Sequence, residues 1–312
     1  MNGIELSEKY YETYGKPMLE EQFPEILPYL ACGICGSGSE CFGYDDAVSQ
    51  DHDYEPGFII FLPGEDVIDR RTAFLLERAY AKLPKEFMGL KRSLMAPAGG
   101  ARHGVIRTED FFLEKTGTKD GILTIGQWLE TPEQSLAEAV NGKIFTDPYG
   151  EVSRIREGLH YFPEKIRRKK LAGQLLLMAL AGQYNYQRCL KHGETAAAQM
   201  AVFEFVKSTM SAIFLLNGVY QPYYKWSFRA LRQLERLSLD AEVMEYLITS
   251  DNDANAEEKY RAIEDIASDV IDELTDQGLT KAICGDLEKH AYSVNDGIDD
   301  AEIRNMHILA AI

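Results

Sequence analysis

The amino-acid sequence predicts an α+β protein in which a small mixed β-sheet with its helices is followed by an all-helical bundle. Short apolar runs typical of buried strands alternate with helical spacing up to about residue 115. Beyond that point strand-like runs nearly disappear, and long segments with helical periodicity replace them. A chain of 312 residues has the length of two domains, which we place at residues 1–118 and 119–312.

In the first half, turn residues bound each expected strand. The run Tyr29–Cys35 follows two prolines and indicates a buried strand. A second strand is expected from Asp51–Tyr54 through Phe58–Leu62, with the intervening Pro-Gly pair as a bulge or bend. Val105–Arg107 indicates a third, short strand, and Thr108 can cap the helix after it. The helices expected in this half span residues 6–23, 66–81 and 108–115.

The second half is expected to be helical, with one turn-rich connector over residues 142–150. The expected helices span residues 124–141, 164–192, 194–216, 226–237 and 256–274. From residue 240 to the end, 19 acidic residues stand against 5 basic ones. We therefore expect the helical domain to finish in an acidic tail that begins at about residue 240.

The charge and the apolar pattern exclude several classes of protein. A formal net charge of -17 repels phosphate backbones and anionic membranes, so nucleic acid is not expected as a partner. The charged amino terminus lacks the apolar stretch of a secretory signal, and Glu204 and Lys207 interrupt the most apolar run. We expect a cytoplasmic protein without a membrane span. The pair Cys32 and Cys35 has no second pair to complete a zinc site, which favours buried, reduced thiols.

A Gly/Ser-rich string followed by two acids is the part of the sequence that indicates a chemical function. The string Gly-Ile-Cys-Gly-Ser-Gly-Ser-Glu ends at residue 40, and Asp51 and Asp53 follow after a loop. Alternate residues of a strand share a face, so both carboxylates would lie together, as a Mg²⁺ site requires. The turn at Gly38 and Ser39 would let backbone N–H groups and a hydroxyl approach a phosphate. The alternative is an ordinary turn before a solvent-facing strand; the joint spacing favours the functional interpretation.

This spacing, with eleven residues between Gly38-Ser39 and Asp51-x-Asp53, resembles the polymerase-beta-like nucleotidyltransferase superfamily. The fuller string, together with stretches at residues 123–129, 161–163 and 216–226, resembles a bacterial family with a nucleotidyltransferase-type amino-terminal domain and a helical carboxy-terminal domain. The resemblance covers about residues 25–240 and names no substrate. It implies transfer of a nucleotidyl group from an NTP, ATP by default, to an acceptor hydroxyl on a small molecule or a protein.

The resemblance also implies roles for the site residues. Asp51 and Asp53 would hold Mg²⁺, and Gly38 and Ser39 would cradle the β- and γ-phosphates. In related antibiotic-modifying enzymes a Glu of the helical domain takes the acceptor's proton, and Glu204 is the counterpart by general position. A salt bridge of Glu204 with Lys207, or a core position, is the alternative.

Further contacts are expected near the end of the resemblance. Lys225 is suited to a triphosphate, and Tyr224 offers a ring surface to a base or acceptor. The alternatives are a purely structural Lys225 and an aromatic cluster that locks helices together. The superfamily often has a third acid on a neighbouring strand, but Val105–Arg107 contains none. A non-catalytic nucleotide-binding sensor, or an antitoxin-like partner protein that retains the fold, is therefore the rival hypothesis. A third hypothesis is an interaction module whose acidic tail docks a basic protein partner.

Overall fold

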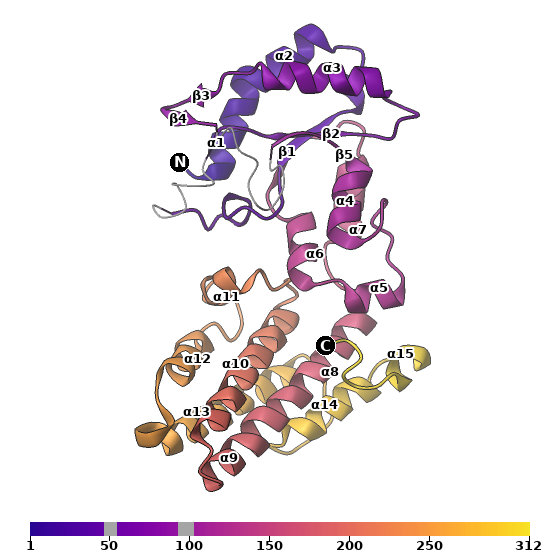
Figure 1. Ribbon diagram of the computed structural model, residues 1–312. Coiled ribbons are helices and arrows are strands. Elements are labelled where there is room, and N and C mark those ends of the chain that lie inside the picture. The colour runs from indigo at the N-terminus through magenta and orange to yellow at the C-terminus, as the bar shows by residue number, and fades with distance from the viewer. Residues whose placement is uncertain (47–54, 93–102) are drawn as a thin grey trace. The chain divides into compact units, whose positions relative to one another are not determined.

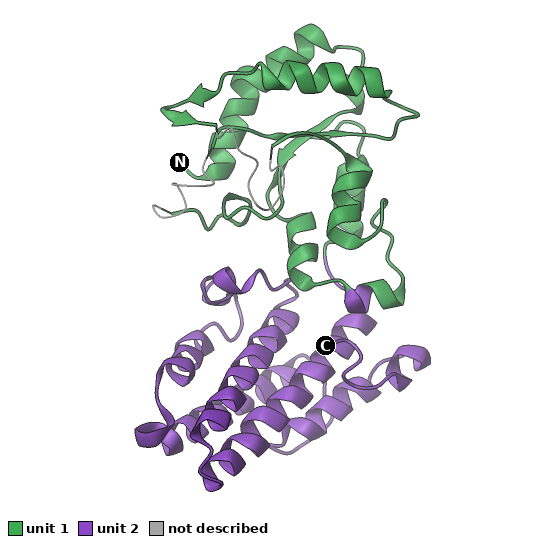
Figure 2. Cartoon of the chain, viewed as in Figure 1, with its two compact units in different colours: residues 1–127, 131–160 green, residues 128–130, 161–312 purple. Residues whose placement is uncertain are grey.

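The computed structural model describes residues 1–46, 55–92 and 103–312 of the chain (Figure 1). It divides into two compact units, coloured separately in Figure 2. Unit 1 comprises residues 1–127 and 131–160, and unit 2 comprises residues 128–130 and 161–312. Unit 1 holds the strands and unit 2 is helical, which confirms the predicted α+β class. The domain boundary that we placed at residue 118 falls between two helices of unit 1 and stays a prediction.

Unit 1 is built on a four-stranded sheet with the order β5-β2-β1-β6. The strands are β1 (Ala31–Ile34), β2 (Ile59–Leu62), β5 (Gly104–Arg107) and β6 (Lys143–Thr146). β1 pairs antiparallel with β2 and with β6, whereas β2 pairs parallel with β5. The sheet is therefore mixed, as predicted. The first and third strands expected from the sequence are present, and the second is present as Ile59–Leu62. The part of the second strand expected at Asp51–Tyr54 lies outside the described residues, and β6 is an addition to the expected strands.

The N-terminal helical segment and α3 cover one face of this sheet (Figure 1). The elements concerned are α1 (Gly3–Tyr10), the π-helical turn η1 (Tyr11–Gly15), α2 (Lys16–Gln22) and α3 (Arg70–Ala81). Along β2 the side chains alternate: Ile60 packs in a cluster with Tyr10 and Leu76, whereas Phe61 meets Phe111 of α4 (Thr108–Thr116) with ring centroids 5.3 Å apart. Period-two alternation thus gives both faces of the sheet an apolar cover.

The rest of unit 1 is made of short elements. They are the 3-10 turns η2 (Leu27–Tyr29) and η3 (Glu40–Phe42), the hairpin β3 (Glu86–Phe87) and β4 (Leu90–Lys91), and the helices α4 (Thr108–Thr116), α5 (Ile125–Glu130), α6 (Glu133–Val140) and α7 (Glu151–Gly158). The interpretation of residues 142–150 as connector alone was wrong, because residues 143–146 form the edge strand β6. Four residues carry too little periodicity to be recognised, and pairing with the distant β1 supplies the strand's hydrogen bonds.

Unit 2 is a bundle of helices. They are α8 (Glu164–Met178), the π-helical η5 (Ala179–Tyr186), α9 (Gln187–Lys191), α10 (Thr195–Asn217), α11 (Tyr224–Leu231), α12 (Asp240–Thr249), α13 (Asn252–Asp276), α14 (Leu287–Asp296) and α15 (Ala301–Asn305). The acidic segment from residue 240 is therefore four helices, whose apolar faces are buried, for example at Ile263 and Val270. Its acidic side chains are exposed or half-buried, except that of Asp240, which is buried.

α10 forms the centre of unit 2. Phe205, Ile213 and Leu215 are fully buried, and the helix contacts α8 and η5 extensively. Among the described residues it is the one helix long and apolar enough to cross a membrane, yet 61% of its most apolar window is buried inside the protein. That burial is what a core helix shows. The cytoplasmic location stays a prediction.

Residues 165–170 of α8 include five basic side chains, and two of them, Lys169 and Lys170, are buried. Lys169 Nζ donates to Asn295 Oδ1 (2.9 Å) and to the Met306 carbonyl (2.7 Å). Lys170 Nζ donates to the carbonyls of Leu129 (3.1 Å) and Ala311 (3.4 Å). These lysines fasten the last residues of the chain to α8, so they belong neither to a solvated face nor to a basic surface for polyanions.

Candidate active site

Four segments meet at one end of the sheet in unit 1. β1 leads at its carboxyl end into the loop of residues 36–39, and its antiparallel partners β2 and β6 start at this same end. β5 starts there too, because it runs parallel to β2. The loop therefore shares this end of the sheet with Glu55 before β2, His103 before β5 and Asn141 before β6.

The loop is fixed at both of its ends by the turn between α6 and β6. The Gly36 N–H donates to Asn141 Oδ1 (2.8 Å), and Asn141 Nδ2 donates back to the Gly36 carbonyl (2.7 Å). At the far end, the Gly142 N–H donates to the Cys41 carbonyl (2.8 Å). Gly142 has φ of +66°, and a side chain there would strike the carbonyl of Ile34, so only glycine permits this approach.

Within this loop Ser39 is buried with an unused hydroxyl. Ser39 is 5% exposed, and its backbone carbonyl accepts from the N–H groups of Phe42 (3.2 Å) and Tyr44 (2.9 Å). Its Oγ, in contrast, has no hydrogen-bond partner in the part of the chain that the structure describes. A Cβ at the neighbouring Gly38 would collide with the Glu40 carboxyl group. Because buried polar atoms are nearly always paired, the free Oγ calls for an explanation, such as a ligand.

Arg156 and Cys35 lie behind the loop. Arg156 Nη2 donates to the carbonyls of Val140 and Asn141, each at 2.7 Å, and so braces the residue that holds Gly36. Burial raises the pKa of the Cys35 thiol to about 11, although the nearby Arg156 and Lys115 act in the opposite direction. Burial likewise raises the pKa of Cys32. The five cysteines are free and this pair is buried and protonated, which confirms the expectation of buried thiols.

The carboxylates expected to bind metal, Asp51 and Asp53, lie outside the described residues. Elsewhere in the described ranges no group of three His, Cys, Asp or Glu side chains could hold a metal ion.

A pair that the sequence interpretation missed occupies the same end. His103 Nδ1 lies 3.3 Å from Glu55 Oε1, and the side chains are 6% and 20% exposed. The two residues are 48 positions apart, and no local spacing connects them. Only the parallel pairing of β2 with β5 brings them together.

The remaining predicted site residues belong to unit 2. Tyr224 and Lys225 lie together in the first turn of α11, where Tyr224 is 76% exposed and the Lys225 ammonium sits 4.9 Å from the Trp226 ring centroid. Tyr220 is buried against Phe162, with centroids 4.8 Å apart, and has a packing role. Glu204 is a half-buried residue of α10 with no hydrogen bond or ion pair to another described residue, so the alternative salt bridge with Lys207 is not formed.

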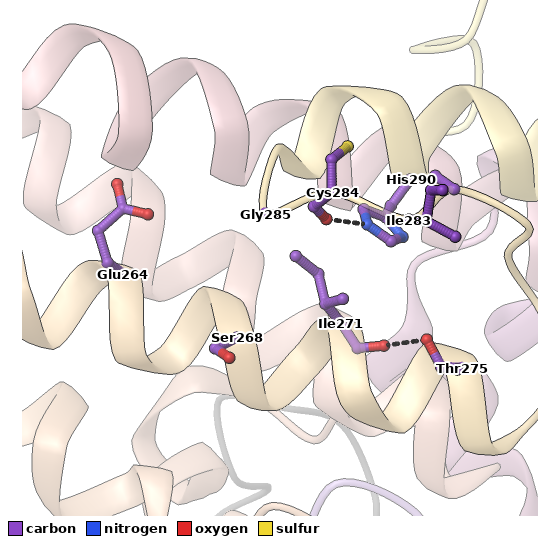
Figure 3. A pocket seen from close by; sticks show the side chains of 9 residues that line it. Glu264, Ser268, Ile271, Thr275, Ile283, Cys284, Gly285 and His290 are labelled. Atoms are coloured by element: carbon purple, nitrogen blue, oxygen red, sulfur yellow. Dashed lines mark hydrogen bonds between the residues drawn. The ribbon is translucent and has the colours of Figure 1, made fainter.

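Unit 2 also contains two clefts that the sequence did not indicate. The first has a volume of about 580 Å³ and lies between α13 and the segment before α14 (Figure 3). Its labelled lining residues are Glu264, Ser268, Ile271, Thr275, Ile283, Cys284, Gly285 and His290. His290 Nε2 donates to the Cys284 carbonyl (2.7 Å), and its Nδ1 shares a hydrogen bond with Thr280 Oγ1 (3.0 Å), so the ring is fixed in the wall of the cleft. The second cleft, of about 430 Å³, adjoins the first at Gly285.

Part of the chain matches a family model. Residues 128–227 match a family described as a domain of unknown function (DUF4037), which is less than half of the chain. No curated protein matches the chain. Among solved structures, the chain is similar to a nucleotidyltransferase-like protein from Exiguobacterium sibiricum. The identity is 11%, the TM-score is 0.39, and the alignment covers 85% of this chain and 77% of that one. Similarity of this size is weak and carries no argument about activity.

Proposed function

We propose that the protein transfers a nucleotidyl group from an NTP, ATP by default, to a hydroxyl group of a small molecule or a protein, with Mg²⁺ as the required ion. The observation that carries this proposal is the loop of unit 1. It is clamped at both ends and contains the buried Ser39 hydroxyl, which has no partner among the residues that the structure describes. Asp51 and Asp53 follow it in the sequence at the spacing of a metal-dependent nucleotidyltransferase.

The residue types of the loop and of the two acids support a Mg²⁺-triphosphate as the ligand. The backbone of the loop at Gly38 and the Ser39 hydroxyl would bind the β- and γ-phosphates, since small residues let N–H groups approach an anion. Two carboxylates, those of Asp51 and Asp53, are the hard oxygen ligands that Mg²⁺ takes. When bound, the ion would align the triphosphate and neutralise charge on the departing pyrophosphate.

Residues of unit 2 complete the proposal. The exposed ring of Tyr224 offers a stacking surface, and Lys225 beside it offers a point charge to a phosphate. Glu204 is the candidate of this unit for the group that takes the proton of the acceptor, because its carboxylate makes no bond to another described side chain.

The test is transfer of label. The purified protein is incubated with Mg²⁺, each of the four α-labelled NTPs, and either cell lysate or a panel of aminoglycosides. We expect label on one acceptor class and release of pyrophosphate, both lost in Asp51→Asn and Asp53→Asn. Asp272→Asn, an exposed acid of α13, is the matched control and should transfer label as the unaltered protein does.

The outcomes separate the two hypotheses for function. Binding of Mg-ATP without transfer to any acceptor, and without pyrophosphate release, would contradict the enzyme and support the non-catalytic sensor or partner protein. Absence of both binding and transfer would contradict both.

A further inference from the structure

The ring of His103 is buried with one nitrogen engaged and the other free. Nδ1 faces the Glu55 carboxyl group at 3.3 Å. Nε2 is buried and has no hydrogen-bond partner among the residues that the structure describes. Where Nδ1 donates to the Glu55 carboxylate, the neutral ring carries its lone pair on Nε2. This is the arrangement in which a carboxylate orients a histidine for proton transfer.

Packing holds the ring in this position. Gly57 lies directly against it, and a Cβ there would be 2.6 Å from the ring Cγ. Gly57 is itself fixed, because Ser7 Oγ donates to its carbonyl (2.6 Å). On the other side, the N–H of Gly104 donates to the Phe58 carbonyl (2.9 Å) and joins the start of β5 to β2. A buried ring with so little freedom is pre-organised for one direction of approach.

Glu55 and His103 also lie at the same end of the sheet as the loop that contains Gly38 and Ser39. Glu55 and His103 precede β2 and β5, and both strands start at the end where the loop of Gly38 and Ser39 leaves β1. Close in the chain to Glu55, the Pro56 carbonyl accepts from Arg92 Nε (3.0 Å). Arg92 stacks over the ring of Tyr80, which is buried and hydrogen-bonded to the backbone of Phe58. Glu55 is therefore the carboxylate that faces the imidazole.

A second buried histidine shows what a structural role looks like in this protein. His290 in unit 2 is fully buried, and both of its ring nitrogens have partners at 2.7 and 3.0 Å. Buried polar groups are normally paired in this way. His103 differs, because its buried Nε2 has no partner among the described residues. Nε2 is the nitrogen that would accept the proton.

We propose that His103, oriented by Glu55, is the general base of the reaction in place of Glu204. This assignment rests on the proposed nucleotidyl transfer. The acceptor oxygen forms a bond to the α-phosphorus, and the bond from that phosphorus to the bridging oxygen breaks to release pyrophosphate. The acceptor's proton passes to His103 Nε2, and Glu55 stabilises the imidazolium until the proton leaves to water.

The experiment measures kcat, the pH dependence of kcat and the Kd of Mg-ATP in five variants. They are His103→Gln, His103→Ala, Glu55→Gln, Glu204→Gln and, as the matched buried-histidine control, His290→Gln. We expect His103→Gln to lower kcat by about 100-fold or more, which is the usual contribution of a general base, without changing the Kd of Mg-ATP. In this variant kcat should no longer fall as the pH is lowered. Imidazole added to His103→Ala should restore part of the rate, which a merely structural role would not allow.

Glu55→Gln provides a second, nearly isosteric test, and we expect a smaller loss of kcat with the acid-side fall retained. His290→Gln, the control outside the proposed site, should keep kcat. If the unaltered protein transfers label and His103→Gln keeps both the rate and the acid-side fall, the assignment is wrong; loss of both in Glu204→Gln would give the role to Glu204. If the unaltered protein binds Mg-ATP and transfers nothing, the proposed function fails, and the assignment falls with it.

Discussion

The hydroxyl of Ser39 is buried and has no hydrogen-bond partner among the described residues. Leaving a buried hydroxyl unpaired costs about 1–3 kcal/mol, so Ser39→Ala is expected to leave the melting temperature unchanged or slightly higher. If the hydroxyl bonds a phosphate, the same change weakens Mg-ATP binding by about tenfold or more. Calorimetry and thermal melting measure the two effects separately.

Ser227→Ala is the matched control for this prediction. Ser227 is also buried, but its Oγ donates to the Pro222 carbonyl (3.1 Å). Its removal should lower stability by about 1 kcal/mol and leave Mg-ATP affinity alone. Loss of stability in Ser39→Ala with unchanged affinity would contradict a ligand-binding role for Ser39.

Asn141 controls the loop from a position about a hundred residues away. Asn141→Asp keeps the shape of the side chain but removes the donor to the Gly36 carbonyl. We expect it to weaken Mg-ATP binding by about tenfold, because the loop no longer has one fixed conformation. Titration calorimetry measures the affinity. Asn217→Asp, which loses donors to Ile213 and Arg236 in unit 2, should leave that affinity unchanged.

Site residues can be predicted from the sequence when they lie close together along the chain. Gly38 and Ser39 could be recognised because one short string contains them, and the structure places both in one clamped loop. Asn141 and His103 could not, because their partners are 105 and 48 positions away and only strand pairing unites them. Asp51 and Asp53 lie outside the described residues and stay a prediction.

At the scale of elements, α12 and α13 bring two acids together. Burial, and then the nearby Asp269, raise the pKa of Asp240 to about 7. Asp240 is thus protonated in the folded protein at pH values where it is ionised in the unfolded chain. The folded state binds the extra proton, so this contribution to stability is complete below about pH 4 and is lost as the pH rises to about 7.

Asp240→Asn should remove this pH dependence. We expect it to raise the free energy of unfolding by about 2 kcal/mol at pH 8 and by much less at pH 5, as measured by urea denaturation. Asp269→Asn should act in the same direction, because it removes the neighbouring charge. An equal effect of Asp240→Asn at both pH values would show that Asp240 does not carry a raised pKa.

Elements differ in how well a sequence predicts them, and length is the reason. Long helices such as α10 and α13 repeat the helical period many times, and both were predicted within a few residues. β6 and the hairpin of β3 and β4 have two to four residues each and depend on partners elsewhere in the chain. The π-helical turn η5 lies inside a segment predicted as one helix. There Gly182 packs directly on Phe205, a contact that periodicity does not encode.

At the scale of the whole molecule, unit 2 takes three residues from the middle of unit 1. Trp128 packs on Phe162 with ring centroids 5.9 Å apart, and the Leu129 carbonyl accepts from the buried Lys170. A fragment of residues 124–312 is therefore expected to be more stable than one of residues 161–312, by about 3 kcal/mol or more. Thermal melting followed by circular dichroism makes the comparison. Equal melting temperatures would mean that residues 128–130 are not part of the folding unit.

The same arrangement means that the polypeptide passes between the units three times, after residues 127, 130 and 160. A single proteolytic nick next to residue 130 would thus yield two fragments, neither of which is a complete unit. The N-terminal fragment would contain β1 and the C-terminal fragment β6, which are hydrogen-bonded neighbours. The two pieces should remain associated on a sizing column under native conditions and separate only in denaturant. Denaturing gel electrophoresis would therefore distinguish the nicked protein from the intact one, whereas elution volume would not.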